Sequence, residues 1–96
     1  MIAEHLKRGK TNKMSLDEIM MATGFTNIRM FRKQLSEERK QGAVILSCPE
    51  GGYYLPENRK EVESYVAMMS KEARSIFYML KPARQYLKET EEKEGA

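Results

Sequence analysis

The 96-residue sequence contains one cysteine, one histidine and no tryptophan. A single cysteine cannot form an intrachain disulfide, and Cys48 together with His5 supplies too few ligands for a zinc site. No run of about eighteen apolar residues is present, which excludes a transmembrane helix. Residues 1–10 also lack the apolar core of a signal peptide. We therefore predict a cytoplasmic protein with no metal, no cofactor and no membrane partner.

Catalytic side chains are similarly scarce. Besides the single histidine and cysteine, the chain offers carboxylates at helix-capping and surface positions rather than in pairs. Acid–base and nucleophilic catalysis need such groups brought together. We predict that the chain is not an enzyme and has no small-molecule substrate. Apolar residues make up 41% of the sequence and charged residues 32%, a balance that favours one folded globular domain.

Residues 15–41 carry the pattern of two helices joined by a tight turn. Ser15 is a good helix N-cap, and Glu18 three positions later completes a capping box ahead of apolar residues at helical spacing. Gly24 is expected to end this first helix. The second helix is expected to begin at Thr26, another good N-cap. The sequence therefore predicts a helix-turn-helix.

The second predicted helix, residues 26–41, has an apolar face and a polar face. Ile28, Phe31 and Leu35 follow at i, i+3 and i+7 and are expected to face a core, and Gly42 is expected to stop the helix. The opposite face carries side chains able to reach phosphates and base edges in a DNA major groove. The residues expected to contact DNA are Thr26, Asn27, Arg29, Arg32, Lys33 and Ser36.

Two interpretations of these side chains stay open. Arg29, Arg32 and Lys33 either contact phosphates and guanine edges or form an ordinary solvated helix face. Thr26 and Asn27 either bond a phosphate together with the N–H groups at the helix start or serve only as caps.

A β-hairpin is predicted after Gly42. Residues 43–46 are β-prone, residues 48–52 contain proline and glycine and predict a turn, and residues 53–55 resume the strand. A two-stranded hairpin needs other elements to pack against, and in this position it forms a wing on the helices. The predicted tip has no basic residue, and Glu50 would be repelled by DNA, so we expect no minor-groove contact from the wing.

The segments at either side of this core pattern are also predicted to be helical. Ile2 and Leu6 lie at i, i+4, which predicts a short amphipathic helix over residues 1–8 packed on the helix-turn-helix. A long helix is predicted from Arg59 to at least Lys81, with Asn58 as its N-cap.

Pro82 interrupts the long helical pattern. The helix either kinks there, or a second and shorter helix begins at Pro82. Residues 89–96 are charged and without large apolar side chains, and we expect a frayed tail. The predicted organisation is a winged helix-turn-helix in residues 1–56, a C-terminal helical extension in residues 57–88, and the tail.

Apolar residues in the extension alternate at steps of four and three, which is the spacing of a coiled-coil interface. This stripe comprises Val62, Val66, Met69, Ala73, Ile76, Leu80, Ala83 and Leu87. We predict that the chain forms a homodimer, with a helix folded back on its own domain as the alternative. The predicted dimerisation residues are Val62, Val66, Met69, Ile76 and Leu80.

Four short motifs follow one another along the chain. They are a Gly-x-x-Asn connector at residues 9–12, an Arg-x-x-Gly helix end at residues 39–42, a Gly-Tyr-Tyr-Leu strand at residues 52–55 and a Glu-containing C-terminal helix from Glu61. This set resembles the winged helix-turn-helix family that includes the DNA-binding domain of the biotin repressor. It resembles more closely the small winged-helix proteins encoded by phages and prophages of Gram-positive bacteria. Related sequences usually have an aliphatic residue where this chain has Glu38.

The charge distribution agrees with a DNA-binding function. Residues 1–49 contain nine Lys and Arg against five Asp and Glu, a net charge of +4, whereas residues 50–96 carry −1. Together with what the resemblance implies, we predict a mainly α-helical winged helix-turn-helix that binds double-stranded DNA, as a transcription regulator or a phage replication accessory. The alternative is a winged-helix module that binds another protein, and salt-dependent duplex binding separates the two.

Overall fold

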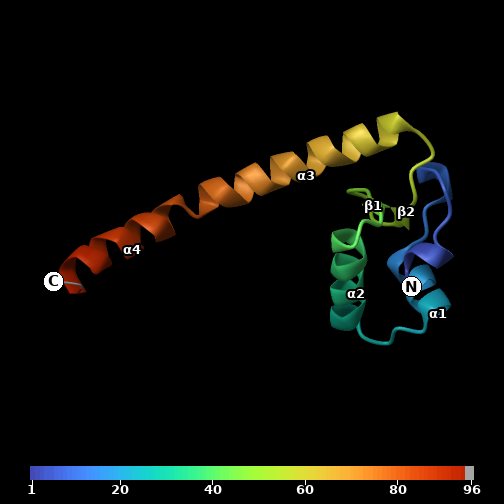
Figure 1. Ribbon diagram of the computed structural model, residues 1–96, viewed down its shortest axis with the longest axis horizontal. Helices are drawn as coiled ribbons and strands as arrows, with labels where there is room; N and C mark the ends of the chain where they lie inside the picture. Colours follow the sequence, from blue (N-terminus) through green and yellow to red (C-terminus); the bar gives the residue numbers. More distant parts are fainter. Residues whose placement is uncertain (95–96) are drawn as a thin grey trace. The chain divides into compact units, whose positions relative to one another are not determined.

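The computed structural model describes residues 1–94, with side chains described as far as Glu91. Its secondary structure is mainly α-helical with a small antiparallel hairpin, and the C-terminal helical segment is long and bent (Figure 1). The fold class predicted from the sequence is therefore confirmed. The chain divides into two compact units, Met1–Tyr65 and a second unit that begins at Val66.

The first unit contains the predicted helix-turn-helix and wing. In chain order its elements are η1 (Ala3–His5), η2 (Lys10–Asn12), α1 (Leu16–Thr23), α2 (Ile28–Lys40), β1 (Leu46–Ser47), β2 (Tyr53–Tyr54) and the first turns of α3 (Arg59–Met79).

Helix α1 begins and ends where its sequence predicts. The Ser15 hydroxyl oxygen accepts a hydrogen bond from the Glu18 backbone N–H at 3.2 Å and donates one to the Glu18 carboxylate at 3.1 Å. Gly24 has the left-handed φ of 82°, and its N–H donates to the Met20 carbonyl. Glycine reaches this conformation without a steric penalty, so the helix stops and the chain turns toward α2.

Helix α2 begins one residue later than predicted. Its N-cap is Asn27, whose side-chain oxygen accepts a hydrogen bond from the Arg29 N–H at 2.8 Å, so Thr26 lies outside the helix. Asparagine is at least as good an N-cap as threonine, which explains the shift. The prediction that Ile28 faces the core is wrong, because this side chain is 46% exposed. Phe25 from the turn packs edge-on against Phe31 instead.

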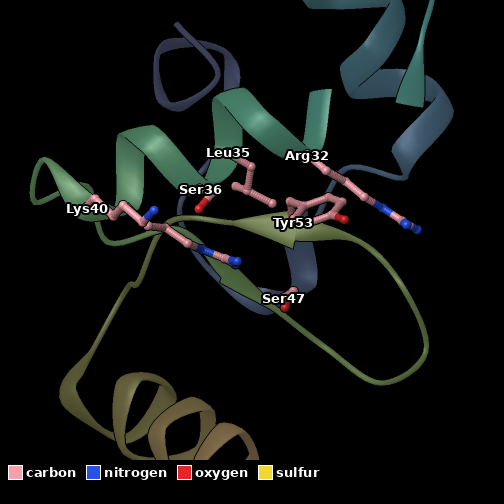
Figure 2. Close-up of a pocket in the computed structure, with 7 residues that line it drawn as sticks. Arg32, Leu35, Ser36, Lys40, Ser47 and Tyr53 are labelled. Atoms are coloured by element: carbon pink, nitrogen blue, oxygen red, sulfur yellow. The ribbon is translucent and has the colours of Figure 1, made fainter. Parts of the chain in front are cut away.

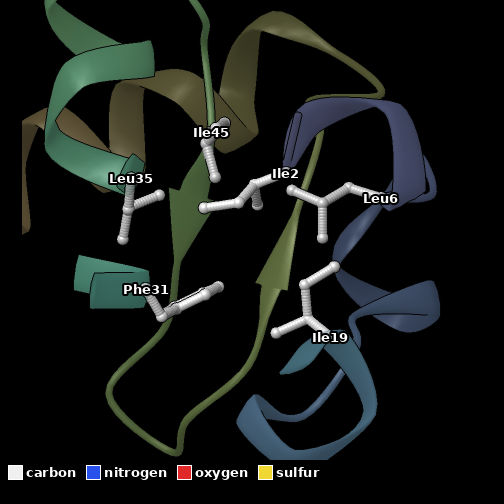
Figure 3. Packing of buried hydrophobic residues seen from close by; sticks show 6 residues of the cluster. All are labelled: Ile2, Leu6, Ile19, Phe31, Leu35 and Ile45. Carbon is white, nitrogen blue, oxygen red and sulfur yellow. The ribbon is translucent and has the colours of Figure 1, made fainter. Parts of the chain in front are cut away.

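The main hydrophobic core joins α1, α2, the N-terminal segment and the chain before β1. Figure 3 shows its side chains pointing toward one another from these four segments. The buried members are Ile2, Leu6, Ile19, Phe31, Leu35 and Ile45. Tyr53 of β2 packs edge-on against Phe31, with ring centroids 5.5 Å apart. This core fixes the angle at which α2 presents its other face.

The N-terminal segment contributes to the core without forming the predicted helix over residues 1–8. Only the short 3-10 turn η1 forms, and Leu6 has an extended backbone with φ −87° and ψ 147°. The extended conformation lets the chain pair with the wing, because the Leu55 N–H donates to the Lys7 carbonyl and the Gly9 N–H donates to the Leu55 carbonyl, both at 2.8 Å. Backbone pairing therefore replaces helix hydrogen bonds here.

The hairpin has shorter strands than predicted. Leu46 pairs with Tyr54 and Ser47 with Tyr53 in antiparallel register. On its other side β2 exchanges backbone hydrogen bonds between Tyr53 and Met14, at 2.8 and 2.9 Å. An isolated hairpin is only marginally stable, and this additional pairing together with the core contact of Tyr53 supplies the support that it needs.

Gly9 occupies a crowded position with a positive φ of 92°, and an added Cβ would lie 2.7 Å from a Glu57 carboxylate oxygen. That oxygen ends an exposed side chain and can move aside, so the backbone decides the cost. We expect Gly9→Ala to lower the free energy of unfolding by about 2–3 kcal/mol, because φ 92° with ψ 141° is a conformation that almost only glycine adopts. Gly24→Ala is the matched control, since φ 82° with ψ 5° is the left-handed helical conformation, which other residues adopt at a smaller cost. Urea denaturation measures both variants, and an equal loss in the two would contradict the backbone argument.

The second unit consists of the later turns of α3 and of α4 (Lys81–Glu94). The break lies at Leu80, whose N–H donates to both the Ile76 and Phe77 carbonyls at 3.2 Å. Proline has no N–H and its ring clashes with the preceding helical turn, so Pro82 is accommodated in the first turn of α4. Of the two predicted alternatives, the structure has a second helix, which begins one residue before Pro82.

The segment predicted to be a frayed tail is helical over residues 89–94, and residues 95–96 lie outside the described range. Local hydrogen bonds support the last described turns. The Thr90 hydroxyl donates to the Tyr86 carbonyl at 3.0 Å, and the Gln85 amide donates to the Glu89 carboxylate at 3.3 Å.

Candidate nucleic-acid interface

The two faces of α2 have opposite character. Phe31, Leu35 and Glu38 are buried on the inner face. Along the outer face, exposed polar side chains recur at i, i+4, i+7 and i+11, which places them in one line along the helix. We call these residues the outer stripe, and they are Arg29, Lys33, Ser36 and Lys40.

All six residues predicted to contact DNA are exposed. Arg29, Lys33 and Ser36 lie in the outer stripe, and Arg32 lies beside it on the flank of α2. Thr26 and Asn27 lie at the start of the helix, where the Asn27 side chain is already used as the N-cap. The structure therefore brings the four α2 residues together on one surface.

An open hollow of about 520 Å³ lies between α2 and the hairpin. Figure 2 shows Arg32, Ser36 and Lys40 on the α2 side, with Ser47 and Tyr53 of the hairpin across from them. Two cationic side chains and three side chains with hydroxyl groups thus border one concave surface. Such groups are suited to hold a phosphate, because cations supply charge and hydroxyls donate hydrogen bonds.

Arg39 also lines this hollow, but its guanidinium is engaged by the protein. Its Nε and Nη2 both donate to the Ile45 carbonyl, at 3.0 and 2.8 Å, and its guanidinium carbon lies 5.5 Å from the centre of the Tyr65 ring. These two hydrogen bonds connect the end of α2 to the segment that leads into β1. Arg39 therefore positions the hairpin against α2 and leaves Arg32 and Lys40 as the cations available to a ligand.

Sequence reasoning missed Lys40 and Ser47 as members of this surface. Lys40 had a detectable signal, because it continues the spacing of Arg29, Lys33 and Ser36 by one more turn. Ser47 had no such signal in the sequence, since its position on this surface depends on where the hairpin strands begin.

The cations of α2 have no carboxylate partner within the described part of the chain. The ion pairs there involve other residues, such as Arg59 with Glu63 at 2.7 Å. Glu37 is the one exposed acidic residue of α2. The outward face of the helix therefore carries a net positive charge, which is the electrostatic character that phosphate binding requires.

The tip of the hairpin carries negative charge that is partly compensated. The Glu50 carboxylate lies 4.0 Å from the Lys10 ammonium. The pKa of Glu50 is lowered from its ordinary value by its own backbone N–H, by the Cys48 thiol and by Lys10. Cys48 itself is buried, and its thiol donates to the Gly51 carbonyl at 3.0 Å.

The comparisons with known proteins found no matching family model, no matching curated protein and no matching solved structure. Among residues 1–94, no helix is long and apolar enough to cross a bilayer. Within the same range, no group of three or more His, Cys, Asp or Glu side chains could hold a metal ion.

Proposed function

We propose that this chain binds double-stranded DNA, with α2 in the major groove and the hollow beside the hairpin against the phosphate backbone. The observation that carries this proposal is the line of exposed cations on the outer face of a helix whose inner face is fixed in the core, with no carboxylate partner among the described side chains. A major groove admits an α-helix, and arginine matches the two acceptors on the groove edge of guanine. The proposed role of this DNA binding is transcription regulation or assistance in phage replication.

The charges on α2 set the expected strength of binding. Arg29, Arg32, Lys33 and Lys40 are four cations able to reach phosphates, and each neutralised phosphate contributes about 0.9 to the slope of log K against log salt. One module should therefore show a slope of about −3.6. Without base readout, such binding is weak at physiological salt, with dissociation constants of roughly 10⁻⁴ to 10⁻⁶ M.

We expect Arg29→Ala, Arg32→Ala, Lys33→Ala and Lys40→Ala each to weaken duplex binding. Loss of a phosphate contact should reduce the magnitude of the salt slope by about one, whereas loss of a base contact should cost about 1–3 kcal/mol at one base pair. Fluorescence anisotropy of a labelled duplex across a salt series measures both quantities.

Lys71→Ala is the matched control, because Lys71 is an exposed cation of the second unit, away from α2 in the sequence. The proposal fails if the four α2 variants bind with the affinity and salt slope of the unaltered chain. It also fails if the control weakens binding as much as they do.

A second candidate function is a protein-binding module, and one specific observation favours it. Apolar side chains are exposed at the helix-turn-helix: Met21 is 85% exposed, Met30 is 60% exposed and Ile28 is 46% exposed. Methionine-rich surfaces of this kind adapt to protein partners. Met30→Ser separates the two functions, since it should leave the salt slope of DNA binding unchanged while weakening a protein contact.

A further inference from the structure

The second unit carries an apolar surface that its own helices do not cover. Its described side chains from Val66 to Glu91 include none that is buried. Several large apolar residues are widely exposed, from 38% for Met69 to 73% for Met79. Helices gain most of their stability in proteins by packing an apolar face, so uncovered helices of this composition call for a partner.

The uncovered residues recur at helical spacing along α3 and α4, on both sides of the break at Leu80. We call this set the apolar seam, and it comprises Val66, Met69, Ala73, Ile76, Leu80, Ala83 and Leu87. Its alternating steps of three and four are the spacing at which two helices pack side by side. Val62, also predicted as a dimerisation residue, lies in the first unit and packs against the buried cluster of Leu46, Cys48 and Tyr54, so the seam is defined from Val66 onward.

The seam itself contains no charged residue. The cations Lys71, Arg74, Lys81 and Lys88 lie on a separate stripe, in which Tyr78 and Gln85 complete the same alternating spacing. At 3.6 residues per turn this stripe falls on roughly the opposite side of the helix from the seam. Glu72 and Arg84 lie at the edges of the seam, and the Arg84 guanidinium carbon is 4.5 Å from the centre of the Phe77 ring. Burying the seam residues therefore buries no charged side chain at the centre of the interface, and the charges at its edges can stay in contact with water.

We propose that the apolar seam is the surface on which a second copy of this chain packs. The seam is complementary to itself in both possible directions. Parallel pairing places every residue opposite its own copy. Antiparallel pairing centred between Ile76 and Leu80 places these two opposite each other, Met69 opposite Leu87, and Ala73 opposite Ala83. Large side chains thus meet large ones over most of the seam, with Val66 opposite Thr90 in the antiparallel case. The layers in which alanine meets alanine fill less space and contribute least to the packing.

The area available matches that of a stable interface. Burying one Val, Leu, Ile or Met side chain removes about 60–120 Å² from water. Two seams contribute ten such side chains, or roughly 600–1,200 Å². Phe77, Met79 and Tyr86 flank the seam and are 56%, 73% and 66% exposed. Each aromatic among them adds on the order of 150 Å². The total reaches the roughly 1,200–2,000 Å² typical of stable complexes.

Sedimentation velocity of the intact chain, from about 1 to about 100 μM, tests this proposal. We expect the unaltered chain to form a dimer and Ile76→Glu to raise the dimer dissociation constant by about 100-fold or more. Pairing would bury two carboxylates in the seam, against each other in a parallel dimer and against Leu80 in an antiparallel one. Tyr78→Glu is the matched control, since Tyr78 is a 70% exposed residue of the same helix outside the seam. It should dimerise as the unaltered chain does.

Residue 76 lies outside the first unit, so Ile76→Glu should leave the thermal unfolding of that unit unchanged. Leu87→Glu, a seam variant near the other end, repeats the test if Ile76→Glu is poorly folded. A monomer at every concentration for the unaltered chain would overturn the proposal. Equal dissociation of the seam variants and of Tyr78→Glu would overturn it as well. Neither outcome depends on whether α2 binds DNA.

Discussion

Glu38→Ala is expected to lower the free energy of unfolding of the first unit by about 2–4 kcal/mol. The Glu38 carboxylate is only 1% exposed. It accepts hydrogen bonds from the Ile2 N–H at 2.7 Å, the Ala3 N–H at 3.0 Å and the Gln34 amide at 2.8 Å. Alanine leaves these donors without an acceptor and releases the segment that holds Ile2 in the core. A unit of this size has a stability on the order of 3–10 kcal/mol, so the loss is a large share.

Urea denaturation with a matched neighbour measures this effect. Glu37→Ala removes an exposed carboxylate from the same helix and should change stability by no more than about 0.5 kcal/mol. Glu38→Gln keeps the shape of the side chain and one acceptor oxygen, so its free energy of unfolding should lie between those of Glu38→Ala and Glu37→Ala. A Glu38→Ala variant as stable as Glu37→Ala would show that the buried carboxylate contributes nothing to the fold.

The pKa of the Glu38 carboxyl should make the stability of the first unit depend on pH. Burial alone would raise the pKa of its carboxyl, but the hydrogen bonds from Ala3, Ile2 and Gln34 outweigh burial, and the pKa lies below its ordinary value. A lowered pKa in the folded state means that the stabilisation is present above the ordinary glutamate pKa of about 4.3 and is lost as pH falls through the folded value. The stability advantage of the unaltered chain over Glu38→Gln should therefore shrink below about pH 4.

The helix boundaries of the first unit could be predicted because they depend on local chemistry. Ser15, Gly24 and Asn58 act on backbone groups only three or four residues away, and each acts where its residue type predicts. The start of α2 shows the limit of this reasoning, because Thr26 and Asn27 are both good caps and the sequence offers no way to choose between them.

Features that depend on long-range contacts could not be predicted. Glu38 sits at a position where an aliphatic residue would face the core, and nothing near it in the sequence shows that Ile2 and Ala3 supply its hydrogen-bond donors. The double hydrogen bond from Arg39 to the Ile45 carbonyl likewise depends on the path of the chain after α2. In the outer stripe, Arg29 and Lys33 were predicted from helical spacing, and the same spacing contains Lys40, which was missed.

On a duplex with two binding sites, Ile76→Glu is expected to weaken DNA binding by about 10²–10⁴-fold. This prediction combines the proposed DNA interface with the proposed pairing through the apolar seam. Under the proposed function each module supplies four α2 cations, which would bind DNA only weakly without a second module. In a dimer the second contact becomes intramolecular, and the effective concentration of the second module rises to roughly the millimolar range.

The salt dependence gives an independent measure of the same effect. The unaltered dimer should show a slope of log K against log salt of about −7, because about eight phosphates are neutralised, whereas the monomeric variant should show about −3.6. On a duplex with one site, Ile76→Glu and the unaltered chain should bind with similar affinity, since only one module is engaged. Tyr78→Glu should behave as the unaltered chain on both duplexes. If Ile76→Glu is monomeric but keeps the full affinity and slope on the two-site duplex, the paired modules do not engage DNA together, and dimerisation serves another purpose.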